Sequence, residues 1–350
     1  MFEDMAKRPA VWLSGEDSTS QIVLSSRIRL ARNISNCSFP SKADTDNREK
    51  VLSFIKSAID KSPVLNRGMF VKCSQLDDLD RNFLLERHLI SLEFRHCRDS
   101  SALFIGGQER VSIMINEEDH LRVQALQSGL NIRDAYQIAA KIDEELAKSL
   151  EFAFDLGFGY LTSCPTNVGT GMRASVLIHL PGLALTREIE NVISEISKLG
   201  LAVRGFYGEG SDVLGSLFQV SNQTTLGRSE DDIMESLEGV TQRIIGYEEN
   251  ARDRLFKDAK NQIEDKIWRA YGILKFARTL TSEEVLNLLS AIRLGIGKGT
   301  VKRVTLSQIN EILAFSQPAH LQKYFNKKMD PGERDRVRAE LVRSKLGGEK

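Results

Sequence analysis

The 350-residue chain lacks the features that mark several large classes of protein. Its apolar runs all fall short of the roughly 18 residues that a membrane-spanning helix needs. The N-terminal segment MFEDMAKRPAVWL has no apolar stretch of the kind that a secretory signal peptide requires. Neither sign of charge is in excess, because 48 basic residues balance 48 acidic ones. We therefore expect no signal peptide, no membrane partner and no direct nucleic-acid partner.

Cysteine is scarce, and its four copies show no CxxC spacing: Cys37, Cys73, Cys97 and Cys164. This pattern argues against a structural zinc site and against a framework of disulfides. We therefore expect no disulfide framework, and a reducing cytoplasm as the compartment.

The familiar phosphate-binding loops are also missing. Residues 297–300, GKGT, are similar to the end of a Walker A motif, but Ile292 stands where the first glycine is needed. In addition, Gly299 separates Lys298 from Thr300. The glycine-rich loop, HRD and DFG sequences of the protein-kinase fold are absent as well. A phosphate site in this chain would therefore depend on arginine side chains and not on a backbone loop.

What is present divides the chain near residue 228. Before that point, short apolar runs typical of strands (21–30, 69–73, 102–105, 111–115, 121–126, 174–180, 201–206 and 217–221) alternate with helical patterns (44–61, 76–90, 131–154 and 183–199). Beyond it, only helical patterns remain, and Ser229, Thr281 and Asp330 stand at positions typical of helix caps. We predict a sheet-containing domain, 1–228, and a helical domain, 229–350, whose last helix ends near residue 345.

The stretch 159–181, GYLTSCPTNVGTGMRASVLIHLP, combines a thiol, a flexible turn and a cation. Two apolar runs typical of strands enclose a loop with Cys164, Gly169 and Gly171. Arg173 stands at the start of the second run. This combination predicts a site for a charged group.

Five arginines lie at strand ends or in loops of the sheet domain: Arg27, Arg29, Arg122, Arg173 and Arg204. Guanidinium groups bind phosphate oxygens in pairs and stay charged at physiological pH. The cluster therefore suits a polyphosphate, although Arg27 and Arg29 taken alone would also fit the charged outer face of a half-exposed strand.

Two acids, Glu118 and Glu209, stand in separate loops of the same domain. If they converge, they can hold a cation, and the planar guanidinium is the cation that matches carboxylates best. Cys164 could join them as a thiolate stabilised by the positive surroundings. For the acidic stretch 116–122, NEEDHLR, a solvated turn is the alternative.

Four motifs occur in the order in which the phosphagen kinases carry them. They are SSRIR (25–29), NEEDHLR (116–122), CPTNVGTGMRA (164–174) and RGFYGEG followed by SNQTTLG (204–227). Together they resemble the catalytic motifs of that family, which includes creatine kinase and arginine kinase. The resemblance implies an α+β fold, an antiparallel sheet flanked by helices, that transfers a phosphoryl group from ATP to a guanidino group. It also implies Mg²⁺ held through the ATP phosphates, without protein ligands.

The resemblance carries over to particular residues of this chain. Catalytic roles fall to Glu118, Glu209 and Cys164. Where creatine kinases have a histidine on the adenine side, this chain has Leu177. The implied ATP-binding residues are Ser26, Arg27, Ile28, Arg29, Leu30, His88, Arg122, Arg173, Ala174, Ser175, Arg204, Gly205, Tyr207 and Gly208.

The order of domains departs from the small-molecule members of the family. Those begin with a helical domain before the SSRIR strand, whereas here that strand starts near residue 21 and a helical domain follows the last motif. This order is similar to that of the bacterial protein-arginine kinases of the stress response, which mark proteins for a Clp-type unfoldase–protease. Their C-terminal domain binds phosphoarginine through an RDxxRA motif. This chain has that motif in Arg334, Asp335, Arg338 and Ala339.

Two alternatives stay open beside a protein-arginine kinase: a small-molecule guanidino kinase, and a non-catalytic adaptor that binds phosphoarginine. Arg334 and Arg338 are four apart on one helix face, a like-charge pair that costs about 0.2–0.5 kcal/mol unless an anion binds. A solvated basic face is the plain explanation of that pair. As partners, the resemblance implies proteins with exposed arginines, the Clp machinery, a separate activator, and a homodimer or larger assembly.

Overall fold

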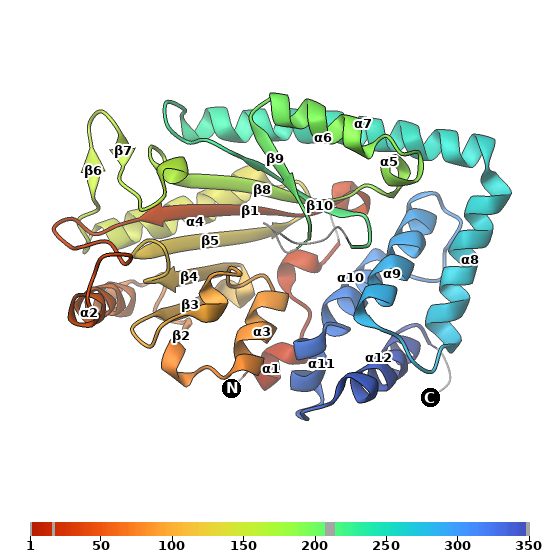
Figure 1. Ribbon diagram of the computed structural model, residues 1–350, viewed down its shortest axis with the longest axis horizontal. Coiled ribbons are helices and arrows are strands. Elements are labelled where there is room, and N and C mark those ends of the chain that lie inside the picture. The colour runs from red at the N-terminus through yellow and green to blue at the C-terminus, as the bar shows by residue number, and fades with distance from the viewer. Residues whose placement is uncertain (1, 16–17, 207–213, 348–350) are drawn as a thin grey trace.

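The structure is a computed structural model that describes residues 2–15, 18–206 and 214–347. A strand-rich region and a group of helices lie side by side (Figure 1). None of the helices in these ranges is both long enough and apolar enough to cross a membrane.

Eight strands of the described residues form one antiparallel sheet. Their order is β2-β3-β4-β5-β1-β8-β10-β9, so the first strand of the chain lies inside the sheet. This architecture, with helices after the sheet, confirms the predicted fold class. The strands are β1 (Val23–Arg32), β2 (Met69–Lys72), β3 (Ala102–Gly106), β4 (Val111–Ile115), β5 (Leu121–Ser128), β8 (Met172–His179), β9 (Leu201–Arg204) and β10 (Leu217–Asn222).

Side-chain alternation along β1 separates its apolar residues from its arginines. Ile28 and Leu30 point into the core, so Arg27 and Arg29 point to the opposite face. On its two neighbouring strands, Arg29 is directly opposite Gln124 and Arg173. Directly opposed residues in antiparallel strands share a face of the sheet. The strand register therefore gathers arginines from several strands on one side.

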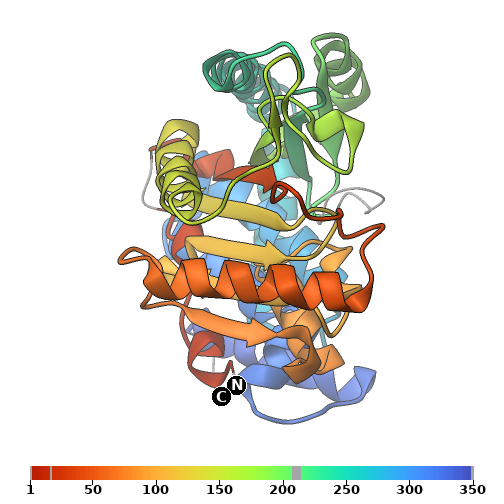
Figure 2. The ribbon, with the colours of Figure 1, turned by 90° about the vertical axis from the view of Figure 1, so that its left-hand side faces the viewer.

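Helices cover the other side of the sheet. Apolar residues of α2 (Thr45–Lys61), α4 (Ile132–Ala147), α6 (Ile189–Lys198) and α7 (Glu230–Asp258) join the strands in the largest core. Figure 2 shows α2 crossing in front of the strands. The carboxylate of Asp44 caps α2 by accepting a hydrogen bond from the Asn47 N–H, so this helix begins where the sequence predicts.

The helices that follow α7 build a second core, which also encloses Trp12 and Leu13 of the short 3-10 helix η1 (Val11–Leu13). Ser229, Thr281 and Asp330 cap α7, α9 and α12, as predicted. Because α7 contributes to both cores, the division near residue 228 stays a prediction. These helices are α8 (Lys260–Phe276), α9 (Ser282–Gly297), α10 (Leu306–Phe315), α11 (Pro318–Tyr324) and α12 (Pro331–Lys345).

Three predicted helices are too long. The helix predicted over 76–90 is α3 (Asp78–Glu86), and the one predicted over 183–199 divides into α5 (Pro181–Leu185) and α6. His88 and Arg187 adopt left-handed backbone angles, which end a right-handed helix. The helix predicted over 131–154 ends at Ala147. The chain beyond it pairs as a hairpin of β6 (Phe154–Asp155) and β7 (Gly159–Tyr160).

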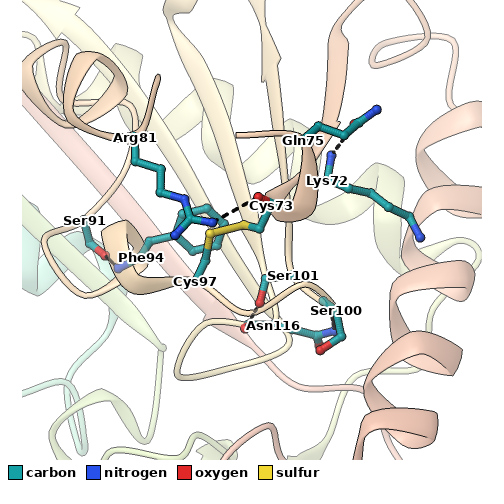
Figure 3. The surroundings of a disulfide bond; sticks show 10 residues. All are labelled: Lys72, Cys73, Gln75, Arg81, Ser91, Phe94, Cys97, Ser100, Ser101 and Asn116. Atoms are coloured by element: carbon teal, nitrogen blue, oxygen red, sulfur yellow. Dashed lines mark hydrogen bonds between the residues drawn. A yellow bond between two sulfur atoms is a disulfide. The ribbon is translucent and has the colours of Figure 1, made fainter. Parts of the chain in front are cut away.

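The expectation of no disulfide framework is wrong for one pair of cysteines. Cys73, which follows β2, is bonded to Cys97, which follows the 3-10 helix η4 (Phe94–His96), as Figure 3 shows. Cys37 and Cys164 are free. The two bonded cysteines are 24 residues apart, a spacing that carries no motif. Only the folding of the chain between them brings their Cα atoms to 6.2 Å.

Candidate active site

A cavity of about 650 Å³ lies on the arginine face of the sheet. Its arginines come from β1, β5, β8 and the end of β9, with Arg98 from the segment before β3, and its other walls are mostly loops. Eight of the candidate catalytic and ATP-binding residues meet there: Arg27, Arg29, His88, Glu118, Arg122, Cys164, Arg173 and Arg204.

The arginines of the cavity repel one another. Burial, and then Arg173 and Arg122, lower the pKa of Arg27 to about 10. Burial and the neighbouring Arg27 lower the pKa of Arg29 well below its ordinary value. The Nε of Arg29 is buried and has no hydrogen-bond partner among the described residues. A concentration of positive charge with an unused donor is the arrangement expected of a polyanion site.

Neighbouring hydroxyl groups hold two of these arginines in place. Arg27 Nε lies 3.4 Å from Ser175 Oγ, and Arg173 Nη2 lies 3.2 Å from Ser221 Oγ. A hydroxyl carries no charge, so these two contacts orient the guanidinium groups without neutralising them.

The three acids of the turn between β4 and β5 have different surroundings. Arg122 is 2.6 Å from Glu117 and 2.9 Å from Glu118, so it pairs with both. Asp119 is buried and accepts hydrogen bonds from Asn33 Nδ2 and from the Ser163 N–H, both at 2.7 Å. Asp119 thereby fastens this turn to the loop that carries Cys164. Ion pairs and hydrogen bonds to other elements therefore fix the conformation of this turn, so the alternative of a solvated turn does not apply.

Glu118 is the most exposed of the three acids and is suited to accept a proton. Burial raises the pKa of its carboxyl, with repulsion from Asp119 and Glu117 adding to the rise and Arg122 opposing it. A carboxylate with a raised pKa binds a proton more readily than an ordinary glutamate does.

Cys164 faces the cavity from the start of the 3-10 helix η6 (Pro165–Asn167). Its Sγ lies 3.0 Å from Thr166 Oγ1. Beyond it, Gly171 has a φ of 64°, and a Cβ at this position would lie 2.6 Å from the carbonyl oxygen of Ala31. The glycine is therefore needed for the close approach of this loop to β1.

Several predicted nucleotide contacts do not line the cavity with their side chains. Ile28, Leu30 and Ala174 point into the core, because alternate residues of a strand face opposite sides. Ser26 binds the backbone of Gly129 on that side. These residues could therefore contact a ligand in the cavity only through their backbone atoms. Gly205 is buried away from the lining, and Tyr207, Gly208 and Glu209 lie outside the described residues.

At His88 the lining of the cavity changes from arginines to aromatic rings. The His88 ring contacts Trp12 and Phe206 edge to face, with ring centroids 5.1 and 5.0 Å apart. Burial, and then Arg27, lower its pKa to about 3, so the imidazole is neutral at pH 7. These rings, with Leu177, line a recess of about 20 Å³ that opens beside the arginines.

The sequence alone does not single out Glu117 or Trp12 as site residues. Glu117 stands among three consecutive acids, and nothing in that run tells which of them pair with Arg122. Trp12 lies in an N-terminal segment without a motif, and only the fold brings it to the recess. Its indole Nε1 is buried without a hydrogen-bond partner among the described residues.

No group of three or more metal-ligating side chains gathers in the described part of the chain. The cavity's neighbouring acids Glu117 and Glu118 are both paired with Arg122. The residues present therefore suit a cation that arrives with an anionic ligand better than one held by the protein.

The RDxxRA residues lie on α12 and do not line the cavity. Arg338 is 1% exposed and donates to the carbonyl oxygens of Ser316 and Leu280, each at 2.7 Å. It also pairs with Asp335. Arg334 is half-buried and donates to the Met329 carbonyl. A phosphoarginine site at these residues stays a prediction.

Glu86, the last residue of α3, joins the sheet region to the helices that surround this motif. Its carboxylate accepts hydrogen bonds from the backbone N–H groups of Ala319 and His320 at 2.8 and 2.7 Å. Burial raises its pKa to about 7, although these bonds and the charges of Arg338 and Arg334 oppose the rise.

The free energy of unfolding should therefore contain a term that decreases as pH rises. Glu86 keeps its proton in the folded state up to about pH 7, whereas the unfolded chain releases it near pH 4.5, so folding is favoured most below pH 4.5. Chemical denaturation between pH 4.5 and 7 measures this term. Glu86→Gln should flatten the pH dependence, and Glu340→Gln, at an exposed position, should not. Equal slopes in the two variants would contradict the raised pKa.

Comparisons with known proteins show the family of this chain. Residues 50–251 match the family model described as ATP:guanido phosphotransferase, C-terminal catalytic domain. Residues 260–350 match the model described as Protein-arginine kinase McsB C-terminal domain. The "Protein-arginine kinase" of Symbiobacterium thermophilum is 43% identical over 347 residues, 98% of each chain. That of Bacillus cereus strain G9842 is 45% identical over 341 residues, 97% of this chain and 96% of its own.

Solved structures agree with the fold. A lombricine kinase superposes with a TM-score of 0.60 at 26% identity, over 70% of each chain. The duplicated taurocyamine kinase of Schistosoma mansoni superposes with a TM-score of 0.62 at 25% identity, over 70% of this chain and 35% of its own. The class is thus that of the kinases that phosphorylate guanidino groups from ATP. The chain belongs to the ATP:guanido phosphotransferase family, in its branch of protein-arginine kinases.

Proposed function

We propose that this protein transfers the γ-phosphoryl group of ATP to arginine side chains of other proteins. One observation carries the proposal: a cavity lined by mutually repelling arginines also holds Glu118, a carboxylate with a raised pKa. The first feature suits a polyphosphate and the second suits a guanidinium that must lose a proton. The named relatives, at 43–45% identity, support protein arginine as the acceptor.

The arginine face would hold the phosphates of ATP, and Mg²⁺ would arrive with them. Arg29 offers its unused Nε, and Arg27 and Arg173 offer guanidinium groups already oriented by serine hydroxyls. Mg²⁺ bound to the phosphates supplies further neutralisation of their charge. The base would lie at the His88 end of the cavity, where the His88 ring adjoins Arg27 and the small ring-lined recess.

The acceptor arginine would enter against Glu118. A guanidinium has a pKa above 12, so its nitrogen has no free lone pair at neutral pH. Glu118 would orient the group and accept a proton as the N–P bond forms and the bond from phosphorus to the ADP oxygen breaks. Cys164 faces the same space, and Glu209 would supply the second carboxylate. The product is a phosphoramidate.

Finer features of the proposal are supported by the family resemblance. The helical region 229–350 would form a regulatory domain that binds phosphoarginine through Arg334, Asp335, Arg338 and Ala339. The phosphorylated proteins would pass to a Clp-type unfoldase–protease during stress. The enzyme would act in the cytoplasm, as a homodimer or larger assembly, under a separate activator.

Phosphoarginine mapping tests the proposal. The protein is incubated with ATP and an arginine-rich protein, and modified residues are identified by mass spectrometry under non-acidic conditions. We expect acid-labile phosphate on arginine, with free arginine a poor acceptor in a parallel reaction. Acid-stable label on serine or threonine would contradict the proposal. Equal use of free arginine would favour a small-molecule kinase, and no transfer at all would favour an adaptor.

The position of the base can be tested through Trp12. ATP binding should change the fluorescence of Trp12, and Trp12→Phe should lose this signal while Trp268→Phe keeps it, because Trp268 is half-exposed on α8. If the signal is retained in Trp12→Phe, the base lies elsewhere.

A further inference from the structure

The disulfide closes a loop that contains much of the cavity wall. Between Cys73 and Cys97 lie α3, His88 and the residues up to η4, and this part of the described chain contributes more cavity-lining residues than any other. Apart from η4, the chain from 87 to 101 has no helix or strand. The covalent bond therefore closes a wall that is held by turns and not by regular helices or strands.

The wall is connected to the acids of the site. Phe94 donates its N–H to Ser91 Oγ at 3.0 Å, and the Ser91 hydroxyl in turn donates to the carboxylate of Glu117. Glu117 pairs with Arg122. The Cys97 N–H donates to the Phe94 carbonyl at 2.9 Å. Figure 3 shows the residues around the disulfide, with the Arg81 guanidinium bonded to the Cys73 carbonyl. A continuous series of contacts thus joins the disulfide to Arg122, one of the arginines that line the cavity.

The two sulfur atoms differ in access. Cys73 is fully buried, whereas Cys97 is half-buried and lines the cavity. The Cys97 sulfur is therefore the easier of the two for an incoming thiolate to reach, and the cavity offers a path to it. The arginines that suit a polyphosphate also attract an incoming thiolate. A nucleotide in the cavity would remove both the path and the attraction.

We infer that the Cys73–Cys97 disulfide is a redox switch for nucleotide binding, in which the bonded form fixes the cavity wall and the reduced form releases it. The inference rests on the proposed function, because it takes ATP as the ligand of the cavity. Disulfides of intracellular proteins are commonly transient and redox-sensing. The switch would couple the kinase to oxidising conditions.

The chemistry is thiol–disulfide exchange with a dithiol as reductant. One thiolate of the dithiol attacks the Cys97 sulfur, the bond between the two protein sulfurs breaks, and Cys73 leaves as a thiolate that takes up a proton. The second thiol of the reductant then attacks the mixed disulfide and releases Cys97. Two electrons and two protons pass to the protein, and the dithiol becomes a disulfide.

Linkage makes the effect reciprocal. If the bonded form binds MgADP about fivefold more tightly than the reduced form, the lower end of the usual coupling between two sites, MgADP must favour the bonded form by the same factor. For a two-electron couple, this factor lowers the reduction potential of the pair by about 21 mV. Both quantities are measurable on the intact protein.

The experiment compares the oxidised and the dithiothreitol-reduced protein. Alkylation after denaturation should label two cysteines in the oxidised protein, Cys37 and Cys164, and all four after reduction. Calorimetry should show at least about fivefold weaker MgADP binding after reduction. MgADP should also slow the reduction and shift its midpoint.

Two variants isolate the pair. Cys73→Ser/Cys97→Ser should bind MgADP like the reduced protein and ignore dithiothreitol, and Cys37→Ser should respond as the wild type does. Four labelled cysteines without reduction, or equal affinity in the two states, would overturn the inference. The wild-type comparison needs no variant, so it decides even if the double variant fails to fold. Absence of MgADP binding in both states would instead contradict the proposed function.

Discussion

Glu118→Gln should lower kcat for phosphoryl transfer to protein arginine by about 10²- to 10⁴-fold, the usual contribution of a positioned acid or base. The amide keeps the size of the carboxylate but cannot accept the proton that the guanidinium must lose. Binding of MgATP should be nearly unchanged, because the arginines that suit the phosphates remain. Transfer is measured by phosphoarginine mapping and nucleotide binding by calorimetry on the same preparation.

The pH profile separates a base from a merely structural carboxylate. Burial raises the pKa of Glu118, so transfer by the wild type should be lost on acidification at a higher pH than an ordinary glutamate would give. Glu93→Gln removes a negative charge that contributes to this rise, so it should move the acid limb to lower pH. Two results for Glu118→Gln would show that another group accepts the proton. One is an unchanged kcat, and the other is a pH profile that keeps the loss of transfer on acidification.

Local features of the site could be predicted from the sequence, whereas features that depend on strand order could not. The spacing of Arg27 and Arg29 is enough to put both on one face of a strand, because strands alternate with a period of two. Their meeting with Arg122 and Arg173 depends on the strand order β5-β1-β8, which no local pattern encodes. The family resemblance supplied that information, because the motifs of a family identify residues that its shared fold brings together.

Other features could not be predicted because their cause lies in tertiary packing. The Cys73–Cys97 bond and the approach of Trp12 to His88 depend on how separate elements dock. The interruption at Arg187 depends on a left-handed residue within an otherwise helical pattern. The surroundings of the RDxxRA motif likewise could not be predicted from local spacing. Helical spacing suggests two cations on one face, yet Arg338 is buried and bonded to three groups of its own chain.

Arg29→Met should make the protein more stable and at the same time nearly inactive. Arg29 is half-buried at the cavity and faces the charges of Arg27, Arg122 and Arg173, with Glu117 the opposing charge. Replacing a poorly compensated, partly buried charge with an apolar side chain of similar size should raise the free energy of unfolding by about 1 kcal/mol or more. Losing one donor to the phosphates should lower kcat by about 10²- to 10³-fold. Denaturation without nucleotide and the transfer assay measure the two effects.

Arg32→Met is the matched control, because the same substitution on the same strand should have the opposite effect on stability. Arg32 is buried, and its Nη2 lies 2.8 Å from Asp143 Oδ2, whose side chain is 13% exposed. Removing Arg32 leaves this largely buried carboxylate without its partner, which should cost about 3–5 kcal/mol. Arg29 is thus costly to the fold and useful to a ligand, whereas Arg32 is part of the fold. If Arg29→Met destabilises the protein as Arg32→Met does, Arg29 has a structural partner and its charge is not reserved for a polyphosphate.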